Sequence, residues 1–191
     1  ARAVDNKNNG VLWRRKTGID ANGNTIWSAW SNTSSIYKDD DVQFKFSMWR
    51  NSIGNHRYDK LKAWVDWNNT NYFSSGKYVE GKLGDNVGDE ILIDRNWQKN
   101  HDVNDNLDTS ASGNPNSSLS GKNSNQLYRE YIVNTKVPSY AVVDDVWLRA
   151  RVVCSESLVN HSNNYNLSAY GYQTQGEVED HKLTILAKSE A

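Results

Sequence analysis

The stretch VWLRARVVC, residues 146–154, alternates aliphatic side chains with larger or charged ones at a period of two. Successive side chains of a β-strand point to opposite faces of a sheet, so one face of this stretch is aliphatic. The other face carries Trp147, Arg149 and Arg151. This pattern predicts a strand with one face in a core and the other against water or a second layer.

The same period recurs elsewhere in the chain. No window shows a convincing helical stripe, and turn-rich segments separate the alternating stretches. The other expected strands are residues 42–48, 61–67, 90–97, 126–133 and 181–187. Several short strands with such connections predict an all-β fold, specifically a two-sheet antiparallel β-sandwich of jelly-roll or immunoglobulin-like topology.

We expect all 191 residues, 1–191, to form a single domain. An N-terminal hairpin is predicted at about residues 11–30, where DANGN supplies side chains that tolerate positive φ. About residues 94–126 contain almost no core-forming side chains, which predicts a long polar loop. The opening string ARAVDNKNNG resembles a cut inside a longer polypeptide, so neighbouring domains are expected partners.

Composition excludes several classes of protein. The net charge is −1, so the chain offers no basic field for a phosphate backbone, and we expect no nucleic-acid partner. No apolar run approaches the roughly 18 residues of a membrane span, so no membrane insertion is expected. A single cysteine, Cys154, excludes an intrachain disulfide and a cysteine-based zinc site.

The most unusual stretch is YGYQTQGEVEDHKLTI, residues 170–185, which gathers three carboxylates just before a predicted terminal strand. Alternation puts Glu177 and Glu179 on one face and Asp180 on the other. In a structural interpretation, Glu179 or Asp180 pairs with an arginine of the neighbouring strand. The arginines available for this pairing are Arg149 and Arg151.

A metal-binding interpretation stays open beside the structural one. Calcium takes about six to eight oxygen ligands, and the three acids could supply some of them together with an earlier Asp and Asn. The candidate calcium ligands are Asp66, Asn68, Glu177, Glu179 and Asp180. Catalysis is the least favoured use of these carboxylates, because structural ion-pair networks often imitate sites.

Three blocks together resemble the GEVED domain of secreted bacterial proteins. They are KAWVDWNNTNYFSSGK (62–77), VPSYAVVDDVWLRARV (137–152) and YGYQTQGEVEDHKL (170–183), and the likeness spans about residues 42–187. The resemblance implies a β-sandwich module found beside peptidases, glycan-active enzymes and adhesins in exported proteins, and it implies no catalytic activity. It also implies a secreted or cell-surface location.

Aromatic residues supply the candidate binding surface. The chain has eight Trp and ten Tyr against three Phe, and sugar rings stack on exposed aromatic faces beside polar rims. Trp27 and Trp30 are expected at opposite-parity positions of one strand. Trp97 lies at the mouth of the polar loop and is the preferred surface aromatic, with Tyr170 and Tyr172. The alternative is that these tryptophans lie in the core or cover Arg and Lys stems.

The sequence therefore predicts a non-catalytic accessory or adhesion module of a secreted or surface bacterial protein, binding a glycan or glycoprotein surface. None of the four histidines lies in a zincin or triad-like context, so we expect no enzyme. A structural spacer beside a catalytic domain, with or without calcium, is the first alternative. A hydrolase acting on a polymer is the second.

Overall fold

The structure is a computed structural model. It describes residues 10–51, 58–73, 91–98, 111–112, 126–154, 167–171 and 176–188. Only the backbone is described at residues 48–51, 58–59, 95–98, 111–112, 126–129, 154 and 176. Every regular element in the described ranges is a strand, and none of them contains a helix long and apolar enough to cross a membrane.

The described residues form two five-stranded sheets. In chain order the strands are β1 (Val11–Ile19), β2 (Thr25–Trp27), β3 (Ile36–Tyr37), β4 (Asp41–Asn51), β5 (Tyr58–Val65), β6 (Ile91–Gln98), β7 (Ala111–Ser112), β8 (Gln126–Lys136), β9 (Asp145–Cys154) and β10 (Gly176–Leu186). The first sheet has the order β2-β1-β4-β8-β7, and the second has the order β3-β10-β9-β5-β6.

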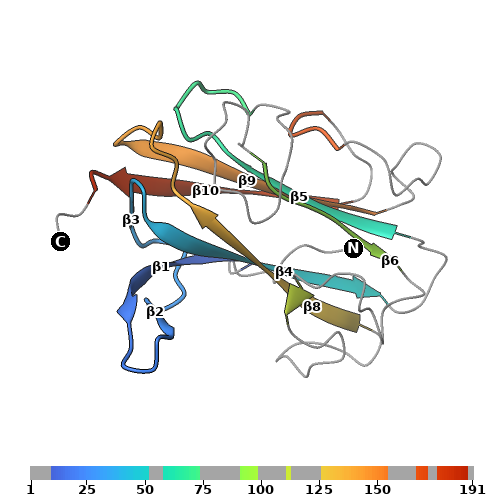
Figure 1. Cartoon of the computed structure of the whole chain (residues 1–191). Coiled ribbons are helices and arrows are strands. Elements are labelled where there is room, and N and C mark those ends of the chain that lie inside the picture. The colour runs from blue at the N-terminus through green and yellow to red at the C-terminus, as the bar shows by residue number, and fades with distance from the viewer. Residues whose placement is uncertain are drawn as a thin grey trace.

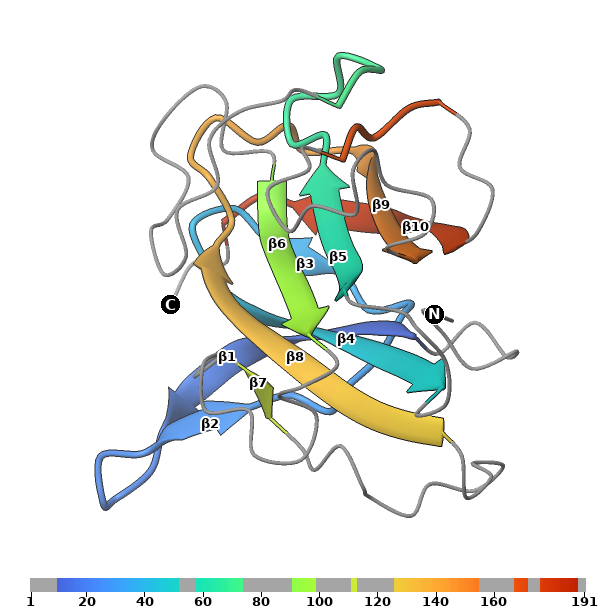
Figure 2. The same ribbon diagram turned by 90° about the vertical axis from the view of Figure 1, so that its right-hand side faces the viewer.

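The two sheets form two layers around a shared core (Figures 1 and 2). Phe44 and Tyr131 enter this core from the first sheet, and Leu61 and Leu148 enter it from the second. The all-β, two-sheet prediction is thus confirmed. The alternation in the predicted strands is confirmed as well, since Val42, Phe44 and Phe46, and likewise Val146, Leu148, Ala150 and Val152, are all buried.

The expectation of purely antiparallel sheets is wrong for one pairing. β3 runs parallel to the end of β10, with Ile36 opposite Ile185, so the second sheet is mixed. β3 is only two residues long and is entered after the chain leaves the first sheet. Side-chain periodicity does not show whether two strands pair parallel or antiparallel. A strand of two residues is also too short to show any periodicity.

Part of the outer face of the second sheet is also covered. Trp64 on β5 is 1% exposed and packs with Ile91, Val153, Leu167 and Ala169 in a second apolar cluster. From the sequence, this face was expected to contact either water or a second layer. The structure shows a second layer over part of it. The segment 167–171 belongs to that layer, and it carries the candidate site.

The polar loop predicted at about residues 94–126 is wrong for residues 94–98 and 111–112, which lie in strands. Residues up to Gln98 continue β6 antiparallel to β5, and Ala111–Ser112 pairs with β8. Asp94 remains in the strand because its carboxylate lies 2.9 Å from Lys60 Nζ and 3.7 Å from Lys62 Nζ, both of which are buried cations. The rest of the predicted loop, residues 99–110 and 113–125, lies outside the described residues.

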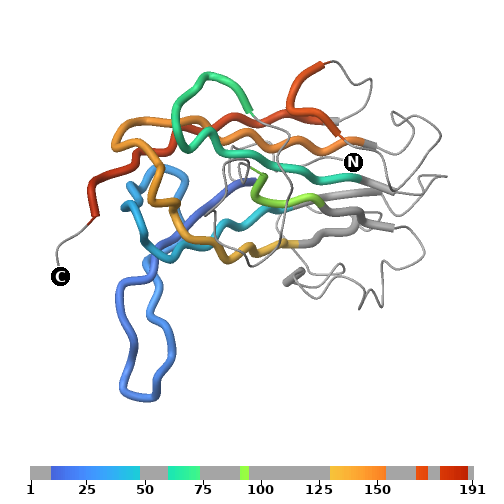
Figure 3. Tube along the Cα trace, turned by 45° about the horizontal axis from the view of Figure 1, so that its top comes forward, coloured from blue at the N-terminus to red at the C-terminus, as the bar shows by residue number. Residues whose placement is uncertain are grey.

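The predicted N-terminal hairpin is confirmed. β1 and β2 project from the body of the fold, with the turn at the far tip (Figure 3). One carboxylate oxygen of Asp20 accepts hydrogen bonds from the backbone N–H groups of Asn22 and Asn24, at 2.8 and 2.9 Å. Gly23 has a φ of 82°, which costs glycine little because it has no Cβ.

The turn should therefore respond to acid. The hydrogen bonds from Asn24 and Asn22 lower the pKa of Asp20, despite a smaller opposing effect of desolvation. A carboxyl whose pKa is lower in the folded state stabilises above its unfolded pKa, and this contribution is lost as pH falls through the folded pKa. We expect the amide-proton shifts of Asn22 and Asn24 to titrate together, with a midpoint below the ordinary Asp value of about 3.9. NMR measures both shifts, and Asp20→Ala should abolish the shared titration.

Candidate functional site

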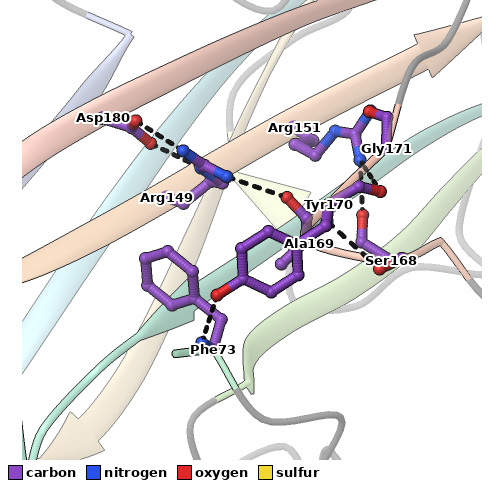
Figure 4. A network of polar contacts seen from close by, with 8 residues as sticks. All are labelled: Phe73, Arg149, Arg151, Ser168, Ala169, Tyr170, Gly171 and Asp180. Carbon is purple, nitrogen blue, oxygen red and sulfur yellow. Dashed lines mark hydrogen bonds and ion pairs between the residues drawn. The ribbon is translucent and has the colours of Figure 1, made fainter. Parts of the chain in front are cut away.

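Arg149 on β9 and Asp180 on β10 form a bidentate ion pair on the outer face of the second sheet (Figure 4). Arg149 Nε and Nη2 each donate to one carboxylate oxygen of Asp180 at 2.8 Å. The two residues are direct cross-strand partners. The prediction that an acid of this string pairs with an arginine of the neighbouring strand is confirmed. The hydrogen bonds to Asp180, opposed by burial, raise the pKa of Arg149.

The two arginines of β9 also hold the segment 167–171 against the sheet. Arg149 Nη1 donates to Ala169 O at 3.0 Å. Arg151, which is 3% exposed, donates to three further backbone carbonyls. Its acceptors are Ser168 O at 2.6 Å, Tyr170 O at 3.0 Å and Gly171 O at 3.0 Å. A segment without strand hydrogen bonds of its own thus has most of its carbonyls satisfied by guanidinium groups.

A second loop reaches the same place from β5. Just beyond this strand, the carboxylate of Asp66 accepts hydrogen bonds from Thr70 N and Thr70 Oγ1, both at 3.0 Å, and from Asn71 N at 2.8 Å. Asn69 and Asn71 have φ values of 54° and 62°, a conformation that Asn adopts more readily than most residues. The NNTN string is therefore a tight turn built around a buried carboxylate. It ends by presenting Tyr72 and Phe73.

The two loops meet in an aromatic ledge, which we define as Tyr72, Phe73 and Tyr170. The rings of Tyr72 and Tyr170 stack with centroids 5.1 Å apart and an interplanar angle of 21°. Phe73 N donates to the hydroxyl of Tyr170 at 2.7 Å, and Arg149 Cζ lies 5.4 Å from the Phe73 ring centroid. Tyr72 is 61% exposed and Tyr170 is 38% exposed. Two contacting aromatic rings, those of Tyr72 and Tyr170, are thus exposed at the surface.

Of the expected surface aromatics, only Tyr170 is placed in this ledge. Tyr172 lies outside the described residues, and Trp97 is described only as backbone in β6. Sequence reasoning missed Tyr72 as a surface aromatic. It placed Trp147 on the face of β9 that carries Arg149, and Trp147 is 50% exposed there. The turn-forming NNTN string was the only signal that Tyr72 follows a fixed turn.

The five candidate calcium ligands are not brought together. Asp66 is engaged by its own turn, and Asp180 by Arg149. Glu177 and Glu179 lie opposite Val152 and Ala150, on the core-facing side of β10. Asn68 lies in the Asp66 turn. In the described ranges, no three His, Cys, Asp or Glu side chains are grouped as a metal ion requires.

Glu179 instead lies beside His181 inside the fold. His181 Nε2 is 2.7 Å from Glu179 Oε1, and the side chains are only 9% and 10% exposed. The contact is an ion pair when His181 is protonated, but it lacks the alignment of a hydrogen bond. The His181 ring also meets Trp13 edge-on at 6.0 Å. This pair was not predicted, because period-two alternation alone gives no reason to bury an acid.

The two other expected aromatics lie on the first sheet. β2 ends at Trp27, and Trp30 lies beyond it, so they do not share one strand as expected. Residues 28–30 belong to no strand, so the parity of a strand does not extend from Trp27 to Trp30. Both indoles lie against Arg14, with ring centroids 5.3 and 4.2 Å from its Cζ.

Comparisons with family models, curated proteins and solved structures found no match to this chain.

Proposed function

We propose that the chain is a non-catalytic, GEVED-like accessory or adhesion module of a secreted or surface bacterial protein, and that its aromatic ledge binds glycan. The observation that most directly supports glycan binding is the exposed, stacked pair of Tyr72 and Tyr170. The jelly-roll or immunoglobulin-like topology expected from the sequence belongs to this proposal. It is supported by a chain that passes repeatedly between the two sheets.

The chemistry of the ledge suits a sugar. The C–H face of a pyranose packs on aromatic rings, and nearby polar groups select among its hydroxyls. Around Tyr72 these polar groups are the side chains of Asn69, Thr70 and Asn71 in the Asp66 turn. A site that needs little ordering on binding loses less free energy to conformational entropy. The hydrogen bonds of Asp66, Arg149 and Arg151 supply that order before any ligand arrives.

The first experiment is a glycan-array screen of the labelled chain, with calcium and then with EDTA. Binding to a defined set of glycans supports the proposal. Loss of that binding in EDTA would place calcium in the function, with Asp66 and the acids of the 177–180 string as the residues to test. A blank array in both conditions, with positive controls working, contradicts glycan binding and favours the structural spacer.

Tyr72→Ala tests the ledge directly. Tyr72 is mostly exposed, so its removal should leave the melting temperature nearly unchanged. It removes the outer ring of the stack, and we expect affinity for an array-positive glycan to fall about tenfold, as for an aromatic hot spot. Isothermal titration calorimetry measures the change. Val178→Ala, which truncates a side chain that is also half exposed but lies on β10, is the matched control and should bind normally.

A further inference from the structure

A second cluster lies on the opposite outer face of the fold, on the first sheet. We call it the Arg14 cluster: Arg14, Trp27, Trp30 and Lys45. Arg14 and Lys45 point outward from β1 and β4, since their neighbours Trp13, Phe44 and Phe46 are buried in the core. The Trp30 ring lies 4.2 Å from Arg14 Cζ and 4.5 Å from Lys45 Nζ, measured to its centroid. One indole thus contacts two cations.

Arg14 lacks an anionic partner in the described part of the chain. Its Nε donates to Gln43 Oε1 at 2.8 Å, and its two terminal nitrogens have no described acceptor. Two other arginines of the described residues are paired with acids: Arg149 with Asp180 at 2.8 Å and Arg15 with Asp40 at 3.5 Å. Burial lowers the pKa of Arg14, as expected for a partly desolvated cation without a counter-charge. The planar guanidinium group of Arg14 is therefore held in place, and its terminal N–H groups can bind an anion.

An amide row continues the surface across the sheet. Gln43 Nε2 donates to Asn134 Oδ1 at 2.7 Å, which fixes the orientation of both amides. Asn134 is exposed, and its amide group is a donor suited to a hydroxyl oxygen. Glu130 Oε1 lies 4.0 Å from Lys45 Nζ, at the limit of an ion pair. The face thus combines cations, indoles and oriented amides.

We propose that the Arg14 cluster binds an acidic saccharide through its carboxylate or sulfate group. The guanidinium fork of Arg14 matches either planar or tetrahedral oxyanions, and Lys45 adds a second positive charge. The indoles give the sugar an apolar wall, and Asn134 a hydroxyl partner. A simple inorganic anion would interact only with the positive charges of Arg14 and Lys45. This site is independent of the aromatic ledge, because the two lie on opposite faces of the fold.

The test is a titration of the whole chain with four probes at one ionic strength. They are a galacturonic acid hexamer, a sulfated galactose hexamer, a neutral glucose hexamer and sodium sulfate. Binding is followed by calorimetry and by the indole N–H resonances of Trp27 and Trp30. We expect saturable binding of one acidic hexamer or both, with shifts of these two indoles, and the better binder identifies the acidic group. Equal binding of the neutral hexamer or of sodium sulfate, or no acidic binding, would overturn the proposal.

Variants separate a specific site from general electrostatic attraction. Arg14→Met keeps an apolar stem beside the indoles, and we expect affinity for the acidic hexamer to fall about tenfold or more. Lys182→Met makes the same charge change on the other sheet and should cost less than about threefold. Equal losses in the two variants contradict the proposal. If Arg14→Met does not fold, Arg14→Lys carries the test, since its single ammonium cannot replace the fork, and unchanged affinity there would overturn it. Tyr72→Ala should leave acidic binding intact.

Discussion

Arg151→Met is expected to lower the free energy of unfolding by about 3 kcal/mol. Arg151 is 3% exposed and donates to the carbonyls of Ser168, Tyr170 and Gly171. Met fills part of the volume but offers no donor, so these carbonyls must find water or stay unpaired. Segment 167–171 would then detach from the sheet, and the aromatic ledge with it. Urea unfolding followed by tryptophan fluorescence gives the change from the shift in midpoint.

Lys182→Met is the matched control for this prediction. Lys182 also projects from the outer face of the second sheet, but its side chain is 58% exposed and lies 3.7 Å from Asp145. Exposed pairs of this kind contribute little, so we expect a change within about 0.5 kcal/mol. If Arg151→Met is as mild as Lys182→Met, the guanidinium does not hold the segment. Arg151→Met should also abolish glycan binding at the ledge, whereas Lys182→Met should preserve it.

His181→Leu is expected to destabilise the fold by about 3 kcal/mol, because it leaves the buried Glu179 carboxyl group beside an apolar side chain, without its polar partner. The described residues offer Glu179 no other partner than His181, at 2.7 Å. Leu keeps an apolar contact with Trp13, which the His181 ring now meets edge-on. The loss of packing should therefore be small, and the measured destabilisation reports the unpaired carboxyl group. Chemical unfolding at neutral pH gives the value.

The double variant Glu179→Met/His181→Leu decides the cause. Replacing both members of a buried ion pair by apolar groups of similar size is often neutral, so we expect recovery to within about 1 kcal/mol of the parent. The neighbours of the pair on the core face of β9, Leu148 and Ala150, are apolar and suit such a replacement. A double variant as unstable as His181→Leu would show that the histidine ring, and not the pairing, supports the fold.

Much of the fold was predictable because the alternation of apolar and polar side chains in a strand can be read from a few consecutive residues. Val42 to Phe46 and Val146 to Val152 show the core face directly, and DANGN shows a hairpin turn. The cross-strand pairing of an acid with an arginine followed from the same alternation, although the register that selects Asp180 and Arg149 did not. Register depends on contacts between strands distant in sequence, which a single strand does not encode.

The candidate sites were less predictable for two physical reasons. Tyr72 and Tyr170 are 98 positions apart (170 − 72), and only the packing of two loops on β9 brings their rings together. Trp27 and Trp30 were assigned opposite faces of one strand, but β2 ends at Trp27 and both indoles lie beside Arg14. Parity holds only within a continuous strand, and alternation alone does not show where a strand ends.

The sequence by itself determined an all-β chain, its core-facing positions and the N-terminal hairpin. These properties follow from side-chain period and turn chemistry, which are local quantities. The tertiary structure alone decided the parallel docking of β3, the burial of Glu179 with His181, the ledge and the Arg14 cluster. Each of these depends on which strands and loops become neighbours, a choice made by the packing of the whole core.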